Sequence, residues 1–175
     1  VSNLLQEKFR LAANQIEKGL KTVKWSGRWE EYYIDSKTLI LDSSHNPEGA
    51  TMLAGNLEDL VHKTRLKPII LAGTLGEFRA KVLLPIIARY AQEIILLRPN
   101  QPRACPFEIM EKYIPKDYAG KIRHAEVKTI FPYPGLCRVG EKGDILVATG
   151  TIYLIGEILE ALNYDFPVEE QSLQD

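Results

Sequence analysis

Residues 38–57 limit most strongly what this chain can fold into, because they join a strand pattern to a helix pattern across one polar turn. Thr38 to Leu41 is a β-branched and apolar run, which is typical of a strand buried on both faces. Asn46 followed by Pro47 has the pattern of a helix N-cap with proline at the first helical position. Apolar residues at helical spacing follow. Such strand-to-helix turns are where open α/β sheets bind ligands, because free N–H groups and the helix dipole point into the crevice.

Strand and helix patterns alternate along the rest of the chain. Further apolar runs typical of buried strands lie at 68–72, 93–97 and 144–148. A strand-like run at 31–34 is separated from the strand at 38–42 by Asp-Ser-Lys, which indicates an antiparallel hairpin. The alternation predicts a three-layer α/β/α domain, whose mostly parallel sheet of about six strands is opened by that hairpin.

Helical patterns supply the outer layers of this predicted fold. We expect an amphipathic helix over the first twenty residues, ending near Gly19, and a kink or restart at Pro85 in a later helix. The remaining expectations are a helix carrying Phe107, Met110 and Ile114, a short strand at 125–127, one or two helical turns at 136–141 and a last helix over 152–162.

Bulk properties indicate one soluble domain over residues 1–175, in which 1–24 form a leading helix and linker. The net charge is −1 and no basic stripe is present, which argues against a nucleic-acid partner. No apolar run approaches membrane-spanning length, so no membrane partner is expected either. Cys105 and Cys137 lack any metal or redox spacing, so we expect free thiols in a reducing cytosol and a cytoplasmic location.

No standard catalytic motif is complete in this sequence. It contains neither a G-x-x-x-x-G-K-[ST] phosphate loop nor a G-x-G-x-x-G turn. It also lacks the G-x-S-x-G elbow of serine hydrolases, and its three histidines are too scattered to suggest a metal site. We therefore expect no catalytic residue and no metal ligand here, and the remaining candidates are ligand-facing side chains at the ends of strands.

Arg28 and Asp42 are two of these candidates. The guanidinium of Arg28 is planar and permanently charged, which suits phosphate or carboxylate, although pairing with Glu30 or Glu31 at the surface is the commoner fate of an arginine. Asp42 follows a buried strand, where a carboxylate can accept both hydroxyls of a ribose. The alternative role of Asp42 is to cap the following turn.

His45 and Thr151 are the other two candidates. His45 can donate to an anion or carry a proton, and its alternative is a solvent-facing turn residue. Thr151 begins the last helix directly after Gly150, so its hydroxyl and the local N–H groups can hold a carboxylate or phosphate. Plain N-capping is the alternative for Thr151.

Three motifs, read together, resemble the carboxyl-terminal domain of folylpolyglutamate synthase and dihydrofolate synthase, in the Mur ligase superfamily. They are G-L-x(4)-W-x-G-R-x-E at Gly19 to Glu30, D-x-x-H-N-P-x-G-A at Asp42 to Ala50, and T-G-T-I-Y-L-I-G-E at Thr149 to Glu157. The resemblance runs from about Leu20 to Leu162. The tryptophan before Gly-Arg and the Y-L-x-G-E helix favour the folate branch over the peptidoglycan ligases.

The resemblance implies an ATP-dependent ligase in which L-glutamate attacks an acyl phosphate formed on a carboxylate of folate or dihydropteroate. In that family an amino-terminal domain, absent from this chain, carries the phosphate loop, the Mg²⁺ ligands and most of the pterin site. By resemblance, Arg28 would contact the ATP phosphates and Asp42 the ribose, while His45 and Thr151 would face the glutamate. The chain alone is expected to be inactive.

The sequence departs from the family pattern in three places. The family usually has Ser where Thr151 stands and D-G-A-H-N-P where this chain has D-S-S-H-N-P. It also tends to have a D-K-D cluster where residues 76–80 read GEFRA. Two alternatives stay open: a Mur-type ligase of cell-wall synthesis, which lacks a pterin-shaped pocket upstream, and a non-catalytic α/β binding domain, which a natural start near Val1 would favour.

Overall fold

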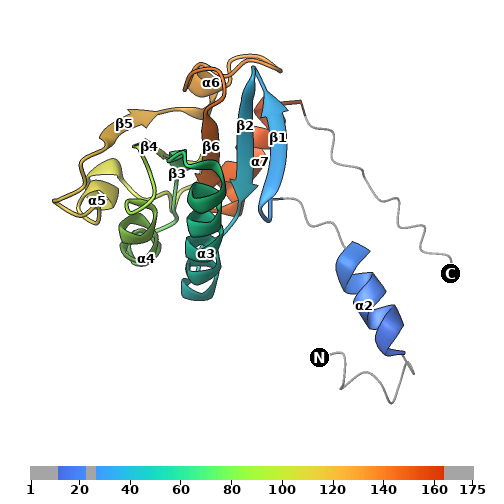
Figure 1. The fold of residues 1–175 in the computed structure, drawn as a ribbon. Helices are drawn as coiled ribbons and strands as arrows, with labels where there is room; N and C mark the ends of the chain where they lie inside the picture. The colour runs from blue at the N-terminus through green and yellow to red at the C-terminus, as the bar shows by residue number, and fades with distance from the viewer. Residues whose placement is uncertain (1–11, 23–26, 164–175) are drawn as a thin grey trace, which may run out of the picture.

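A computed structural model describes residues 12–22 and 27–163 (Figure 1). The first described helix is α2 (Ala13–Thr22), which continues past Gly19, where the sequence led us to expect its end. The earlier part of the predicted first helix lies outside the described residues, as does Trp25 of the first motif.

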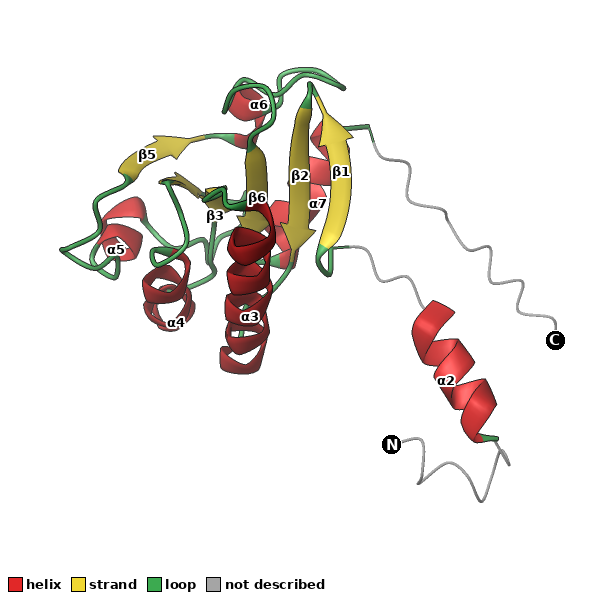
Figure 2. Ribbon diagram, in the orientation of Figure 1, coloured by secondary structure: helices red, strands yellow, loops and turns green. Residues whose placement is uncertain are grey.

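A six-stranded sheet forms the centre of the molecule, with strand order β1-β2-β6-β3-β4-β5. β1 and β2 pair antiparallel, whereas every other neighbouring pair is parallel (Figure 2). The predicted hairpin and the predicted buried strands are therefore confirmed to within one or two residues. The strands are β1 (Glu30–Ile34), β2 (Lys37–Asp42), β3 (Ile69–Ala72), β4 (Glu93–Leu97), β5 (Lys121–Ala125) and β6 (Ile145–Thr149).

Helices cover both faces of this sheet, which confirms the predicted three-layer α/β/α class (Figure 2). One face packs against α3 (Pro47–Thr64), α4 (Glu77–Ile87) and α5 (Phe107–Glu111). The other face packs against α6 (Val127–Ile130) and α7 (Ile152–Ala161).

The apolar strand runs have a direct explanation in these two layers of core. In β6, Leu146 and Ala148 pack on the α7 side, while Ile145 and Val147 pack on the α3 side. Successive side chains of a strand point to opposite faces, so a strand covered on both faces needs apolar residues at every position. This is why these strands could be recognised as continuous apolar runs.

The position that we predicted for the strand β5 was wrong. We expected a strand at 125–127, but the strand is Lys121–Ala125, and α6 begins at Val127. The first four residues of β5 are exposed, so they carry no apolar run from which a strand could be recognised.

Two further expectations concern helical segments. α4 does not restart at Pro85, because the helix continues through this proline and ends at Ile87. The helical turns expected at 136–141 are wrong: these residues form no helix, and backbone groups of the segment bond outside it. The N–H of Arg138 donates to the carbonyl of Ile130 at 2.9 Å, for example.

Candidate functional site

The candidate site lies where β2, β6 and β3 end beside one another. Asp42, the last residue of β2, is the register partner of Thr149, the last residue of β6. Thr149 is in turn the partner of Ala72 at the end of β3, and the N–H of Gly73 donates to the carbonyl of Thr149 at 3.1 Å. The polar residues that follow these strands are therefore gathered at one edge of the sheet.

Two glycines bring the ends of β3 and β6 into close contact. A Cβ atom on Gly150 would lie 2.3 Å from the carbonyl oxygen of Gly73, and Gly150 has a φ of +116°. A Cβ atom on Gly73 would lie 2.7 Å from the carbonyl oxygen of Leu97 at the end of β4. Only glycine fits at these positions, so the strand ends form a tight backbone floor below the first turn of α7.

Asp42 is buried, with 4% of its surface exposed, and its carboxylate is held in place. Its Oδ1 accepts a hydrogen bond from the backbone N–H of Ser44 at 2.9 Å, so the expected turn-capping role is present. Within the described part of the chain, Oδ2 has no hydrogen-bond partner. The carboxylate can therefore cap its own turn and still accept a hydroxyl group of a ligand.

His45 is half-buried, and one nitrogen of its ring is already committed. Nδ1 lies 2.8 Å from the carbonyl oxygen of Ser43. Because a carbonyl only accepts, Nδ1 must carry the hydrogen, and the neutral ring then presents the Nε2 lone pair. In this state His45 can accept a hydrogen bond from an ammonium group.

The helix that follows His45 begins as the sequence predicted. Asn46 is the N-cap of α3, and its side-chain oxygen accepts from the backbone N–H of Gly49 at 2.8 Å. Pro47 occupies the first helical position. The positive end of α3 therefore points to the same edge of the sheet as Asp42.

Thr151 is buried, with 2% of its surface exposed, and is the N-cap of α7. Its Oγ1 accepts from the backbone N–H of Tyr153 at a long 3.4 Å. The plain N-capping alternative is therefore present in the structure. The weak cap leaves the first N–H groups of α7 able to bind an anion as well.

Arg28 lies in the turn that leads into β1, and its side chain is exposed. The preceding residue fixes this turn against the site: the carbonyl of Gly27 accepts from the N–H of Ser43 at 2.7 Å. A Cβ atom on Gly27 would lie 2.9 Å from Cγ2 of Ile155 on α7. The turn that carries Arg28 is thus packed between the end of β2 and α7.

The structure brings all four candidate residues to one edge of the sheet: Arg28 through its neighbour Gly27, Asp42 and His45 after β2, and Thr151 after β6. The sequence did not reveal one further polar group there. The hydroxyl of Thr149 is fully buried and has no hydrogen-bond partner in the part of the chain that the structure describes. Its position next to Asp42 depends on the strand order, which no local pattern encodes.

The two cysteines are free thiols, as predicted, and both are buried. Burial raises the pKa of the Cys105 thiol and of the Cys137 thiol, which disfavours the nucleophilic thiolate. Within residues 12–22 and 27–163, no three His, Cys, Asp or Glu side chains gather to hold a metal ion. None of the helices in these ranges is long and apolar enough to cross a membrane.

Comparison with solved structures identifies this arrangement as a known fold. The bifunctional folylpolyglutamate synthase/dihydrofolate synthase of Yersinia pestis, complexed with AMPPNP and manganese, matches 91% of this chain with a TM-score of 0.67 and 18% identity. The folylpolyglutamate synthase of Mycobacterium tuberculosis, complexed with ADP and AMPPCP, matches 89% with a TM-score of 0.66 and 19% identity. The chain shares its fold with part of these enzymes.

The folylpolyglutamate synthase of Thermotoga maritima also matches, over 88% of this chain, with a TM-score of 0.62 and 24% identity. The chain spans only 37%, 36% and 34% of the three enzymes, in the order given. No protein-family model matches the sequence, and no curated protein matches it. The likeness is therefore one of fold, and the chain corresponds in size to about a third of each enzyme.

Proposed function

We propose that this chain is the carboxyl-terminal domain of an ATP-dependent ligase that adds L-glutamate to a carboxylate of folate or dihydropteroate through an acyl phosphate. The observation that carries the proposal is the gathering of Arg28, Asp42, His45 and Thr151 at one edge of a sheet with the folylpolyglutamate synthase fold. An amino-terminal ATPase domain, which supplies the phosphate loop and the Mg²⁺ ligands, completes the enzyme.

ATP is bound in this proposal by Asp42 and Arg28. The Oδ2 atom of Asp42 accepts from the ribose hydroxyls while Oδ1 remains bonded to Ser44. The exposed guanidinium of Arg28 contacts the phosphates when the two domains close, which places a fixed positive charge beside them in a site that excludes water.

L-Glutamate is bound by His45 and by the start of α7. The Nε2 lone pair of His45 accepts from the amino group, because Nδ1 is held by Ser43. Thr151 and the first N–H groups of α7 bind a carboxylate of the glutamate. The two groups orient the amine for attack on the acyl phosphate, while the chemistry of ATP cleavage belongs to the amino-terminal domain.

The proposal is tested in a ligase that consists of an amino-terminal ATPase domain followed by this chain, assayed for glutamate incorporation. Arg28→Ala should lower turnover by about 100-fold or more, because one charge that stabilises the phosphates is lost. Arg89→Ala is the matched control, because Arg89 is an exposed arginine just after α4 and precedes β4, whereas the site follows the carboxyl ends of the strands. Its loss should leave turnover unchanged. Equal turnover of the wild-type and Arg28→Ala enzymes would remove Arg28 from the site.

A second variant pair tests the glutamate site. Thr151→Val removes the hydroxyl and should raise the KM for glutamate by about tenfold or more, since a hydrogen bond to a charged group is lost. Thr151→Ser keeps the hydroxyl and should retain the wild-type KM. Circular dichroism of both variants separates this effect from the loss of the α7 cap. The purified 175-residue chain alone should ligate nothing, and turnover by it would contradict the division of labour.

A further inference from the structure

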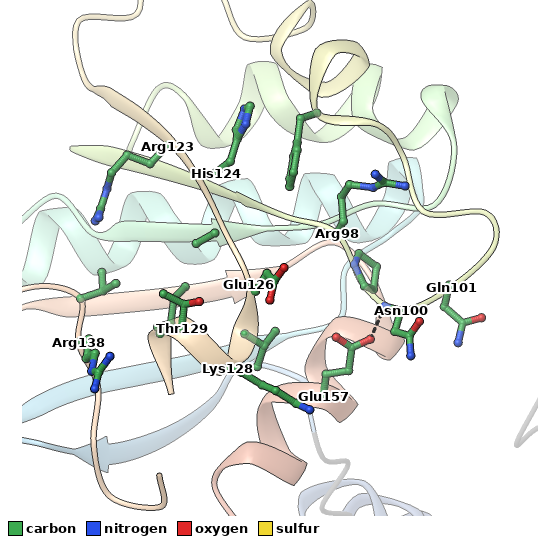
Figure 3. A pocket seen from close by; sticks show the side chains of 16 residues that line it. Arg98, Asn100, Gln101, Arg123, His124, Glu126, Lys128, Thr129, Arg138 and Glu157 are labelled. Atoms are coloured by element: carbon green, nitrogen blue, oxygen red, sulfur yellow. Dashed lines mark hydrogen bonds between the residues drawn. The ribbon is translucent and has the colours of Figure 1, made fainter. Parts of the chain in front are cut away.

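A pocket of about 1070 Å³ lies on the same face of the sheet as α7 and is separate from the Asp42 site. Its walls are the segment after β4, the end of β5, α6, residues 138–139 and one residue of α7, Glu157 (Figure 3). The volume is slightly above the usual range for ligand pockets and far exceeds what one amino acid fills.

Positive charge dominates the rim of this pocket. Arg123 is already paired with Glu93, and His124 is paired with Glu111. The three other cations that line it have no carboxylate partner within the described ranges: Arg98, Lys128 and Arg138. They come from three separate segments, so the positive charges are spread around the pocket rather than concentrated at one point (Figure 3).

Two carboxylates lie among these cations, and they differ in their bonding. Glu157 accepts a hydrogen bond from the backbone N–H of Asn100 at 2.6 Å, which holds the segment after β4 against α7. The carboxylate of Glu126 has no hydrogen-bond or ion-pair partner in the described part of the chain, whereas its backbone carbonyl caps the start of α6. Figure 3 shows Glu126 between Arg98 and Arg138 in this view. A ligand that fits here carries several negative charges and also an N–H donor for Glu126.

The floor between the charges is apolar. Val127, Ile130 and Val139 line it, and all three are buried in the core below. Phe107 closes the end near β4, where its ring stacks on His124 with centroids 4.1 Å apart and the guanidinium of Arg98 lies 6.0 Å from its centroid. This surface suits a ligand with methylene groups between its charges.

We propose that this pocket binds an oligo-γ-glutamyl chain. Such a chain alternates carboxylates with amide N–H groups and joins them by methylene groups, so it matches the spread cations, Glu126 and the apolar floor together. A polyphosphate carries the negative charge but contains no N–H group and no carbon, and the carboxylate of Glu126 repels it.

The choice of a glutamyl chain rests on the proposed function, whereas the charge and size of the pocket do not. Glu157 lies six residues after Thr151 on α7, which is about 9 Å along the helix axis. A chain whose terminal carboxylate reacts near Thr151 therefore has its preceding glutamates within reach of the pocket.

The test is a titration of the 175-residue chain with penta-γ-L-glutamate, followed by the ¹⁵N–¹H shifts of the backbone amides. We expect shifts centred on residues 98–101 and 123–130, and binding that weakens as salt is added. Lys128→Gln and Arg138→Gln should each weaken binding by about threefold, and by about tenfold together. Lys142→Gln, an exposed lysine outside the pocket, is the matched control and should bind like the wild type.

Two other probes define the ligand class. L-Glutamate alone and inorganic tripolyphosphate should each bind about tenfold more weakly than the pentapeptide. Tripolyphosphate that binds as tightly as the peptide would overturn the assignment in favour of a phosphate site. Absence of shifts, or shifts that the double variant leaves unchanged, would overturn the pocket itself. The titration needs no ATP and no ligation, so its outcome is independent of the activity tests.

Discussion

Gly150 is the residue at which the backbones of two neighbouring strands meet. Its φ of +116° is a conformation that residues with a side chain disfavour, and a Cβ atom would lie 2.3 Å from the backbone carbonyl oxygen of Gly73. The two residues are close in space but distant in sequence, since Gly73 follows β3 and Gly150 follows β6.

Gly150→Ala should therefore lower the free energy of unfolding by about 3 kcal/mol or more, from backbone strain and overpacking combined. Gly156→Ala is the matched control, because Gly156 lies inside α7 and a methyl group added there would meet nothing within 4 Å. That change should raise stability by about 0.5–1 kcal/mol, as expected for a helix interior. Urea unfolding of both variants checks the pair, and equal midpoints would contradict the close contact.

At the scale of residues, the sequence predicted those features that depend only on residues close by along the chain. The Asn46 cap and Pro47 could be recognised because a cap bonds only three residues ahead. The contact between Gly73 and Gly150, and the buried hydroxyl of Thr149, could not be recognised, because both depend on β6 lying between β2 and β3.

At the scale of elements, the β1–β2 hairpin is joined to the segment before β6 by one buried cation. The Nζ atom of Lys37 lies 3.0 Å from Oδ2 of Asp35 and 3.0 Å from the carbonyl oxygen of Cys137. Asp35 also accepts from the N–H of Cys137 at 3.3 Å. These bonds hold residues 136–138 in place, which is the physical reason why the helical turns expected there do not form.

Lys37→Met keeps the length of the side chain but leaves the Cys137 carbonyl without its charged donor. We expect the free energy of unfolding to fall by about 2 kcal/mol. Lys142→Met, at an exposed lysine in the same connection, should change stability by no more than about 0.5 kcal/mol. Thermal unfolding at neutral pH measures both, and similar losses in the two variants would contradict the role of Lys37.

The same contact predicts an acid dependence. The hydrogen bond from Lys37, followed by the one from the Cys137 N–H, lowers the pKa of Asp35 below its usual 3.8. The resulting stability is fully present above pH 3.8 and is lost as the pH falls through the lower pKa of the folded state. In Lys37→Met the pKa of Asp35 is lowered less. The free energy of unfolding, measured between about pH 5 and pH 2, should therefore fall less steeply with decreasing pH in the variant. An identical decline in wild type and variant would contradict the assignment.

On the scale of the whole molecule, the centre of the sheet and its β5 edge differ in how well they are covered. β6 lies between β2 and β3, and all five of its residues are buried. β5 is an edge strand with exposed residues at its first four positions. The fold class could be predicted because the covered strands repeat one pattern, while β5 was misplaced because an uncovered edge strand has no such pattern.

Amide hydrogen exchange should show this gradient. Amides of β6 should exchange only through global unfolding, whereas those of β5 should exchange through local opening with a free energy lower by about 2 kcal/mol or more. The internal comparison is β1, which is also an edge strand but has one residue, Ile34, buried in the core. Equal protection of β5 and β6 would mean that the two strands open as one unit.

The hydrogen bond between Gly27 and Ser43 links the chain that enters the domain to the residues that follow β2. The chain arriving at residue 27 is fastened, through a 2.7 Å hydrogen bond, to the residue between Asp42 and the turn that holds His45. A pull on the preceding segment must either break that bond or drag the end of β2 with it. A force on the chain before residue 27 is therefore transmitted through this peptide group to the residues that follow β2.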